Sequence, residues 1–226
     1  MRGRGRHPAG RAARVCRQLN RGDYARGVLL YENPDSGNCY KVRLLLAHLG
    51  IPYERRTLDV IDRSNRPDVL GGLNPALRVP TIVLDDGRAL GESGAIIWYF
   101  GDGTRFVPDD PYLRAQVLQW MFFEQYELEP NIAVARFWLA YSGRPEQARD
   151  RLGEWHRNGN RVLAALDAHL EGRDWLVGDG MTLADIAVYG YTHAAEEGEF
   201  DLEPYANVRA WLDRVAAQPG HVPINA

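Results

Sequence analysis

The chain has 226 residues, 45% of them hydrophobic, which is enough to bury a core in one compact unit or in two small domains. The formal net charge of −3 hides an asymmetry, because residues 1–27 hold eight Arg and one Asp while the remainder is acidic. An acidic body argues against nucleic acid as the main partner. No run of about 18 apolar residues occurs, so we expect no membrane span.

Residues 1–27 form a basic, acid-poor leader. Targeting peptides and nucleic-acid-binding arms can share this composition, but the leader lacks the apolar core of a secretory signal and any sustained amphipathic period. We therefore predict a disordered basic extension. It contains Cys16, and the only other cysteine is Cys39, so neither a structural disulfide nor a zinc site is expected. These features favour a protein of the reducing cytoplasm that holds no metal.

Residues 28–102 predict the element order β-α-β-α-β-β-α. The apolar run at 28–31 predicts a short buried strand, and the turn residues at 33–35 end it. A helical face then ends at Gly50, and its apolar positions are Val42, Leu45, Leu46 and Leu49. Further along, the patterns predict a strand at 51–60 and a short irregular helix or loop at 64–75. A hairpin around Asp86-Gly87 is predicted at 79–90, and a buried helix at 92–100.

After a turn-rich linker at 103–111, residues 112–226 show only helical patterns. The first helix is expected to end before Pro130, and a second to follow at 131–141. Further on, Thr182 and Asp185 form a capping box, which should stabilise its helix by roughly 1 kcal/mol. The sequence therefore predicts an α/β domain at 28–102 followed by an all-helical domain.

Two residue pairs in the first domain are candidates for binding. Pro80 opens a strand, and a cis Val79-Pro80 bond would leave the backbone of Val79 free to pair with an extended ligand; a trans strand-start proline is the ordinary alternative. Glu92 and Ser93 open the buried helix, where Ser93 could simply cap it. A helix N-terminus also attracts carboxylates, and Glu92 could pair with an ammonium group. Together the pairs suit a ligand with both amino and carboxyl groups.

These residues together resemble the glutathione transferases. The segment "NPALRVPTIVLDDGRALGESGAIIWYF" is similar to that family's segment with a cis-proline and a Glu-Ser pair, and "TLADIAVYGYT" resembles its capping box in the second domain. The resemblance covers residues 28 to about 220. It implies a thioredoxin-like N-terminal domain, an all-helical C-terminal domain, glutathione as co-substrate and a two-fold homodimer.

The resemblance also implies roles for individual residues near the first helix. Ser36 matches the serine of the Ser-type classes, which have Ser-x-x-Cys at this turn. It also matches the threonine of a bacterial and fungal group with Thr-Pro-Asn-Gly, and Asn38 then matches that group's asparagine. Either side chain could donate a hydrogen bond to the glutathione sulfur, although a plain N-cap is the structural alternative for Ser36.

The remaining glutathione contacts follow from the same resemblance. Arg78 takes the position that reaches the glycyl carboxylate, and Val79, before Pro80, would pair with the cysteinyl backbone. Glu92 and Ser93 would hold the γ-glutamyl amino and carboxylate groups. The sequence departs from the family pattern at two places, since it lacks the common Gly two residues before Val79 and has Gly94 where Asn is frequent.

The expected chemistry is activation of a thiol. A thiol with a pKa near 8.5 is only about 3% thiolate at pH 7, and lowering that pKa by two units requires about 2.7 kcal/mol of differential stabilisation. A hydroxyl or amide donor at a helix N-terminus can supply this through charge-assisted hydrogen bonding and the helix dipole. The thiolate would then attack an electrophile, a peroxide or a disulfide.

The co-substrate is expected to be apolar and to lie against the helical domain. Candidate pocket residues are Trp120, Phe123 and Arg136, although aromatic residues at helical spacing usually belong to a core, and Arg136 could extend its charge to solvent. Two alternatives stay open: a non-catalytic protein that keeps the fold, and a glutaredoxin-like thiol transferase that uses Cys39. Cys39 alone cannot form the internal disulfide of a dithiol enzyme and is more simply a small buried residue.

Overall fold

The computed structural model describes residues 27–226, so the predicted basic extension, with Cys16, lies outside the described residues except for Gly27. The first half contains the predicted order of elements: β1 (Val28–Glu32), α1 (Gly37–Leu49), β2 (Tyr53–Thr57), α2 (Arg66–Leu70), β3 (Thr81–Val83), β4 (Ala89–Gly91) and α3 (Ser93–Gly101). Within it the strands form one mixed sheet in the order β2-β1-β3-β4. Strand β1 is parallel to β2 and antiparallel to β3, and β3 is antiparallel to β4.

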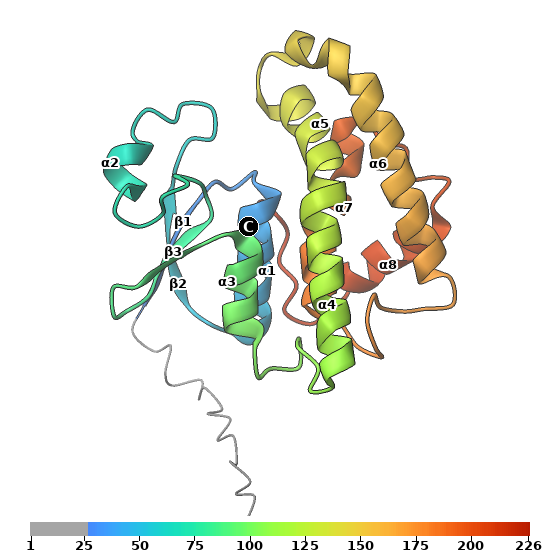
Figure 1. Ribbon diagram of the computed structural model, residues 1–226, viewed down its shortest axis with the longest axis horizontal. Helices are drawn as coiled ribbons and strands as arrows, with labels where there is room; N and C mark the ends of the chain where they lie inside the picture. Colours follow the sequence, from blue (N-terminus) through green and yellow to red (C-terminus); the bar gives the residue numbers. More distant parts are fainter. Residues whose placement is uncertain (1–26) are drawn as a thin grey trace, which may run out of the picture.

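The local signals explain these elements. Gly50 caps α1 in the left-handed conformation, with φ +65°, and its N–H bonds the carbonyl of Ala47 at 3.1 Å. The hairpin between β3 and β4 turns at Gly87, whose φ is +84°. Helices α1 and α3 lie side by side between the sheet and the helical half, while α2 lies on the other side of the sheet (Figure 1).

The regular elements of the second half are all helical. Its elements are α4 (Pro111–Phe123), the π-helix η1 (Glu124–Ala133), α5 (Val134–Arg136), the π-helix η2 (Phe137–Tyr141), the 3₁₀ turn η3 (Pro145–Ala148), α6 (Arg149–Leu170), α7 (Leu183–Thr192), the 3₁₀ turn η4 (Ala195–Gly198) and α8 (Ala206–Ala216). Helix α7 is buried along its whole length and packs against α1, α3 and α4. The capping box predicted at Thr182 and Asp185 is present. Among the described residues, no helix is both long enough and apolar enough to cross a bilayer.

The prediction that a helix ends before Pro130 is wrong. Pro130 lies inside η1, and the chain continues helically into α5. In an α-helix the proline ring would meet the carbonyl four residues earlier, whereas the wider π-turn gives that ring more room. In the same turn the Asn131 side-chain amide donates to the carbonyl of Glu127 at 2.7 Å.

Candidate active site

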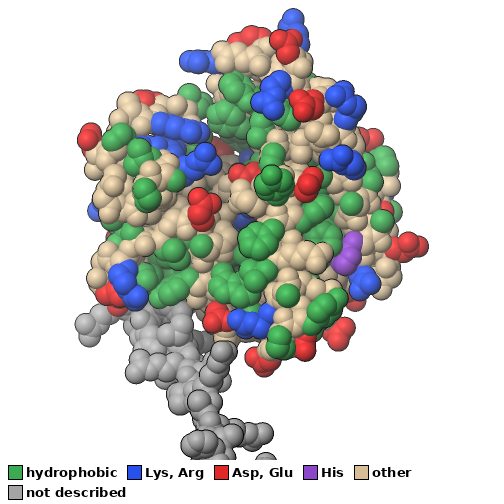
Figure 2. All heavy atoms as spheres, viewed as in Figure 1, with side chains coloured by type: hydrophobic (Ala, Val, Ile, Leu, Met, Phe, Trp, Pro, Cys, Tyr) green, Lys and Arg blue, Asp and Glu red, His purple; other side chains and the backbone are tan. Residues whose placement is uncertain are grey.

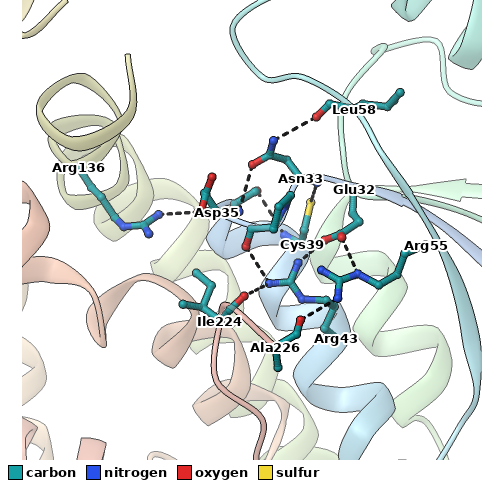
Figure 3. Close-up of polar contacts among 12 residues, drawn as sticks. Glu32, Asn33, Asp35, Cys39, Arg43, Arg55, Leu58, Arg136, Ile224 and Ala226 are labelled. Carbon is teal, nitrogen blue, oxygen red and sulfur yellow. Dashed lines mark hydrogen bonds and ion pairs between the residues drawn. The ribbon is translucent and has the colours of Figure 1, made fainter. Parts of the chain in front are cut away.

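The turn between β1 and α1 is held from several directions. Asn33 donates its side-chain amide to the carbonyl of Leu58 at 3.1 Å, and its own side-chain oxygen accepts the backbone N–H of Asp35 at 3.1 Å. From the helical half, Arg136 Nη1 donates to the carbonyl of Asp35 at 2.7 Å (Figure 3). Contacts from the sheet side and from the helical half therefore fix the backbone that leads into Ser36.

A buried arginine beneath the turn completes this support. Arg43 forms an ion pair with Glu32 and also donates to the carbonyls of Pro34 and Ile224 (Figure 3). Glu32 accepts a second bond from Arg55 Nε at 2.7 Å. Because Glu32 and Arg43 are both buried, each charge needs these partners. The cluster ties the turn to the sheet and to the segment around residue 224.

Ser36 is the N-cap of α1. Its backbone is extended, at φ −76° and ψ 119°, and its Oγ accepts the backbone N–H of Cys39 at 3.4 Å. Accepting that bond leaves the hydroxyl proton available for donation, because a hydroxyl can do both. Cys39 is fully buried, and burial raises the pKa of its thiol to about 11. A thiol held protonated at neutral pH is a poor exchange nucleophile, which argues against the alternative that uses Cys39.

Asn38 lies in the first turn of α1 at the centre of a polar network. Its Nδ2 donates to Glu129 Oε1 at 2.9 Å, and its Oδ1 accepts from Lys41 Nζ at 2.7 Å and from Ser93 Oγ at 3.1 Å. Lys41 also pairs with Glu124 at 2.6 Å, and both side chains are almost inaccessible. Burial raises the pKa of Glu124 to about 7; Lys41 opposes the shift and the charge of Glu129 adds to it.

A cavity of about 350 Å³ opens beside this network. Figure 2 shows a hollow between the two halves of the molecule, with Lys and Arg side chains gathered on the side that carries α2. The cavity lining draws on the β1–α1 turn, the chain around α2, the strand-start segment before β3 and the helical elements η1 to α7. The lining residues are Asn33, Asp35, Ser36, Asn38, Val60, Arg63, Arg66, Arg78, Val79, Glu129, Ala133, Val134, Arg136, Phe137, Trp138, Tyr141 and Tyr191.

The cavity brings together five of the residues predicted from sequence, namely Ser36, Asn38, Arg78, Val79 and Arg136. Four of these come from the α/β half and only Arg136 from the helical half. Arg78 is exposed and Val79 is partly buried. The structure thus places two hydrogen-bond donors, two arginines and a strand-start backbone around one space.

Other predicted residues do not line the cavity. The Val79-Pro80 bond is cis, and Pro80 itself is buried. Glu92 is exposed and precedes α3 with a left-handed φ of +63°, while Ser93 is buried and connects to the cavity only through Asn38. Both begin α3, as expected, and stand near the network rather than in the lining.

The predicted aromatic pocket residues lie elsewhere. Trp120 and Phe123 pack edge to face on α4, with ring centroids 5.0 Å apart. Trp120 also contacts the ring of His169 on α6 at 4.5 Å. Neither residue is among those that line the cavity, so the structure does not bring them to it. The expected core role of aromatic residues at helical spacing describes Trp120 well.

Arg136 lines the cavity, but its guanidinium is already engaged. It donates to Glu197 at 2.9 Å, to the hydroxyl of Tyr141 at 2.7 Å and to the carbonyl of Asp35 at 2.7 Å. Tyr141 in turn donates to Glu197 at 2.6 Å, and burial together with this bond raises the pKa of Tyr141 to about 12. Arg136 therefore joins the helical half to the β1–α1 turn.

Sequence reasoning missed three polar residues at the site. Lys41, Glu129 and Tyr191 were not predicted as site residues. Burial raises the pKa of Tyr191, so its hydroxyl stays protonated in the cavity wall. Gly37 allows this approach, because a Cβ there would lie 2.5 Å from the Tyr191 ring. A glycine at the start of a helix was the one available signal.

Two family models match the chain: the glutathione S-transferase N-terminal domain over residues 35–102 and the glutathione S-transferase C-terminal domain over residues 131–219. A solved glutathione S-transferase from Pseudomonas fluorescens is 44% identical, with a TM-score of 0.84, and the match covers 87% of this chain and 98% of that one. The chain belongs to the glutathione S-transferase family. The resemblance drawn from the sequence is confirmed, and so is the thioredoxin-like and helical fold class.

Two other proteins are similar to this glutathione S-transferase family member over most of its length. A glutathione transferase from Burkholderia graminis, solved with two glutathione molecules bound per subunit, is 30% identical with a TM-score of 0.73; the match covers 86% of this chain and 85% of that one. Maleylacetoacetate isomerase from Pseudomonas aeruginosa is 29% identical over 197 residues, which is 84% of this chain and 92% of that protein.

Proposed function

We propose that this protein is a glutathione transferase that binds glutathione in the cavity and activates its thiol. The observation that carries the proposal is the placement of two donors, Ser36 and Asn38, at the N-terminus of α1 beside Arg78 and Val79. A helix N-terminus stabilises negative charge through its free N–H groups and its dipole. A thiolate is the form of glutathione that such a site favours.

Each binding residue has a distinct proposed role. Arg78, which is exposed and bordering the cavity, would pair with the glycyl carboxylate, and the backbone of Val79 would bond the cysteinyl unit. Glu92 and Ser93 open α3 outside the cavity lining, so the γ-glutamyl end would extend beyond the cavity to them; Glu92 would hold its ammonium and the helix N-terminus its carboxylate. Glutathione is then the co-substrate, and no metal is required for the thiol chemistry.

The reaction follows from the thiolate. The bound thiol releases its proton to solvent, and the sulfur lone pair attacks an electrophilic carbon, so that a C–S bond forms and the leaving group departs with its electron pair. A peroxide or a disulfide is attacked at oxygen or sulfur in the same way. We propose an apolar electrophile for conjugation, because Ala133, Val134 and Trp138 supply an apolar wall to the cavity. Such conjugation would serve detoxification in the cytoplasm.

Calorimetry with glutathione and with S-methylglutathione tests the proposal. Wild-type protein should bind both, and Arg78→Ala should weaken both by roughly tenfold, as expected for the loss of about 1.4 kcal/mol of charge-assisted bonding. An Arg149→Ala variant, changed at the exposed start of α6, serves as the matched control and should bind normally. No heat with millimolar glutathione would contradict the proposal and favour a non-catalytic protein of the same fold.

We also propose a homodimer. Helix α4 and η1 expose three large side chains, Tyr112, Phe122 and Tyr126, which are 67–82% accessible. Exposed aromatic residues of this size are typical of association surfaces. Sedimentation should give the mass of two chains, and Phe122→Glu with Tyr126→Glu should shift it toward one. A monomer in the wild type would contradict this part of the proposal.

A further inference from the structure

Asn38 has its amide orientation fixed by partners of defined chemistry. Lysine only donates hydrogen bonds, so the atom of Asn38 that lies 2.7 Å from Lys41 Nζ must be the oxygen. The Glu129 carboxylate, 2.9 Å from the other amide atom, identifies that atom as nitrogen. The Ser93 hydroxyl, at 3.1 Å from Oδ1, completes the set. The orientation therefore follows from chemistry on both sides of the amide.

This orientation leaves one of the two amide N–H donors of Asn38 available to a ligand. Nδ2 carries two N–H bonds, and Glu129 accepts one of them. In residues 27–226 no group accepts the second, and Asn38 lines the cavity. Were the amide reversed, Asn38 would present a carbonyl oxygen to the cavity, which repels a thiolate. The direction of the amide thus decides whether Asn38 can stabilise negative charge on sulfur.

Lys41 is itself held in place by a buried carboxyl group. Its side chain is 1% accessible and lies 2.6 Å from Glu124, which is 3% accessible. Lys41 also lies over the ring of Tyr191, with Nζ 5.3 Å from the centroid. An ammonium group buried this completely has few alternative positions. Its charge also polarises the Asn38 amide, because a hydrogen bond accepted at the oxygen strengthens donation by the N–H groups.

We propose that Lys41 and Glu124 are positioning residues that act through Asn38, fixing its amide so that an N–H faces the glutathione sulfur. The inference rests on the proposed function. It assigns a role to an ion pair that joins α1 to the helical half and touches no substrate. It also selects Asn38 as an oriented donor beside Ser36, whose hydroxyl stays free to rotate after it accepts the Cys39 N–H.

The test is a double-mutant cycle in which the measured quantity is the thiol pKa of bound glutathione. That pKa is determined from the ultraviolet absorbance of the thiolate. Replacing both partners, as Lys41→Met with Glu124→Leu, removes the ion pair without leaving one charge buried and unpaired, a change that proteins often tolerate. The thiol pKa should rise by about one pH unit, from about 6.5 to about 7.5, which lowers the thiolate fraction at pH 7 roughly threefold. The same change in an Asn38→Ala background should add nothing further. Affinity for S-methylglutathione should stay within about threefold of wild type in all variants.

The matched control removes an exposed ion pair, Arg209 with Glu203, as Arg209→Met with Glu203→Gln, and should leave the thiol pKa unchanged. An unchanged pKa in the variant that lacks Lys41 and Glu124, or an equal rise with and without Asn38, overturns the positioning role while glutathione binding stands. Absence of glutathione binding by the wild type overturns the proposed function instead.

If the variant that lacks the ion pair does not fold, nuclear magnetic resonance of the wild type supplies the second measurement. The Asn38 side-chain amide signals are assigned by their absence in Asn38→Ala. One of the two protons should shift on addition of glutathione and not on addition of S-methylglutathione, whose sulfur cannot ionise. Equal shifts with both ligands overturn the inference.

Discussion

Asp185 gives the sharpest stability prediction. Its fully buried carboxylate accepts four hydrogen bonds: from the backbone N–H groups of Leu176 (3.0 Å) and Thr182 (2.8 Å), the Thr182 hydroxyl (3.0 Å) and the Trp211 indole (2.9 Å). Asp185→Ala would leave three buried N–H donors unsatisfied, at about 1–3 kcal/mol each. Allowing for relaxation around the site, we expect the free energy of unfolding to fall by about 3–5 kcal/mol.

Urea denaturation followed by tryptophan fluorescence measures this loss. Thr182→Ala is the matched variant, because it removes only the hydroxyl, which accepts the Ala184 N–H at 3.3 Å and donates to Asp185 at 3.0 Å, and should cost about 1 kcal/mol. The loss of unfolding free energy in Asp185→Asn should lie between the losses in these two variants. Asparagine keeps the shape of the side chain but turns an amide toward the Thr182 N–H. If Asp185→Ala costs no more than Thr182→Ala, the reasoning from four buried hydrogen bonds is refuted.

Three further predictions follow from buried groups. Burial raises the pKa of Glu124 from 4.5 to about 7, so folding favours the protonated form of this carboxyl group. The stability that protonated Glu124 contributes is therefore complete below pH 4.5 and is lost as the pH rises through about 7. Relative to Glu124→Gln, the wild type should therefore lose on the order of 3 kcal/mol of unfolding free energy across that window, and denaturation curves that run parallel with pH would contradict this. Gly37→Ala should lower the free energy of unfolding by about 1–3 kcal/mol, because the added Cβ would meet the Tyr191 ring at 2.5 Å; an unchanged melting temperature would argue against this close packing. Cys39→Ala should keep glutathione-dependent disulfide reduction while Ser36→Ala loses most of it, since the Cys39 thiol is buried with its pKa raised to about 11, and the reverse result would favour exchange at Cys39.

Local rules predicted the elements that depend on local chemistry. The left-handed cap at Gly50, the hairpin at Gly87 and the capping box at Thr182 each follow from residues within one turn of each other. Pro130 shows where such rules fail, because the chain keeps helical structure around it by widening into a π-helix. Leu77 shows a second limit: it adopts a φ of +53° two residues before Val79, where the family commonly has Gly.

The site was predictable only in part, because local patterns do not reveal contacts between residues far apart in the chain. Ser36 and Asn38 stand beside a strand-to-helix turn, so local pattern and family resemblance both point to them. The contacts of Lys41 with Glu124 and of Asn38 with Glu129 join residues far apart in the chain, and neither partner carries a local signal. Their pairing depends on how the helical half packs against α1, which a single sequence does not reveal.

We propose that the N-terminus of α1 binds glutathione and stabilises its thiolate. The most direct measurement is an ultraviolet titration of glutathione bound to the wild-type protein, with protein lacking ligand as the blank. We predict a thiol pKa near 6.5, about two pH units below the ordinary value. A bound thiol that still titrates near 8.5 would contradict it.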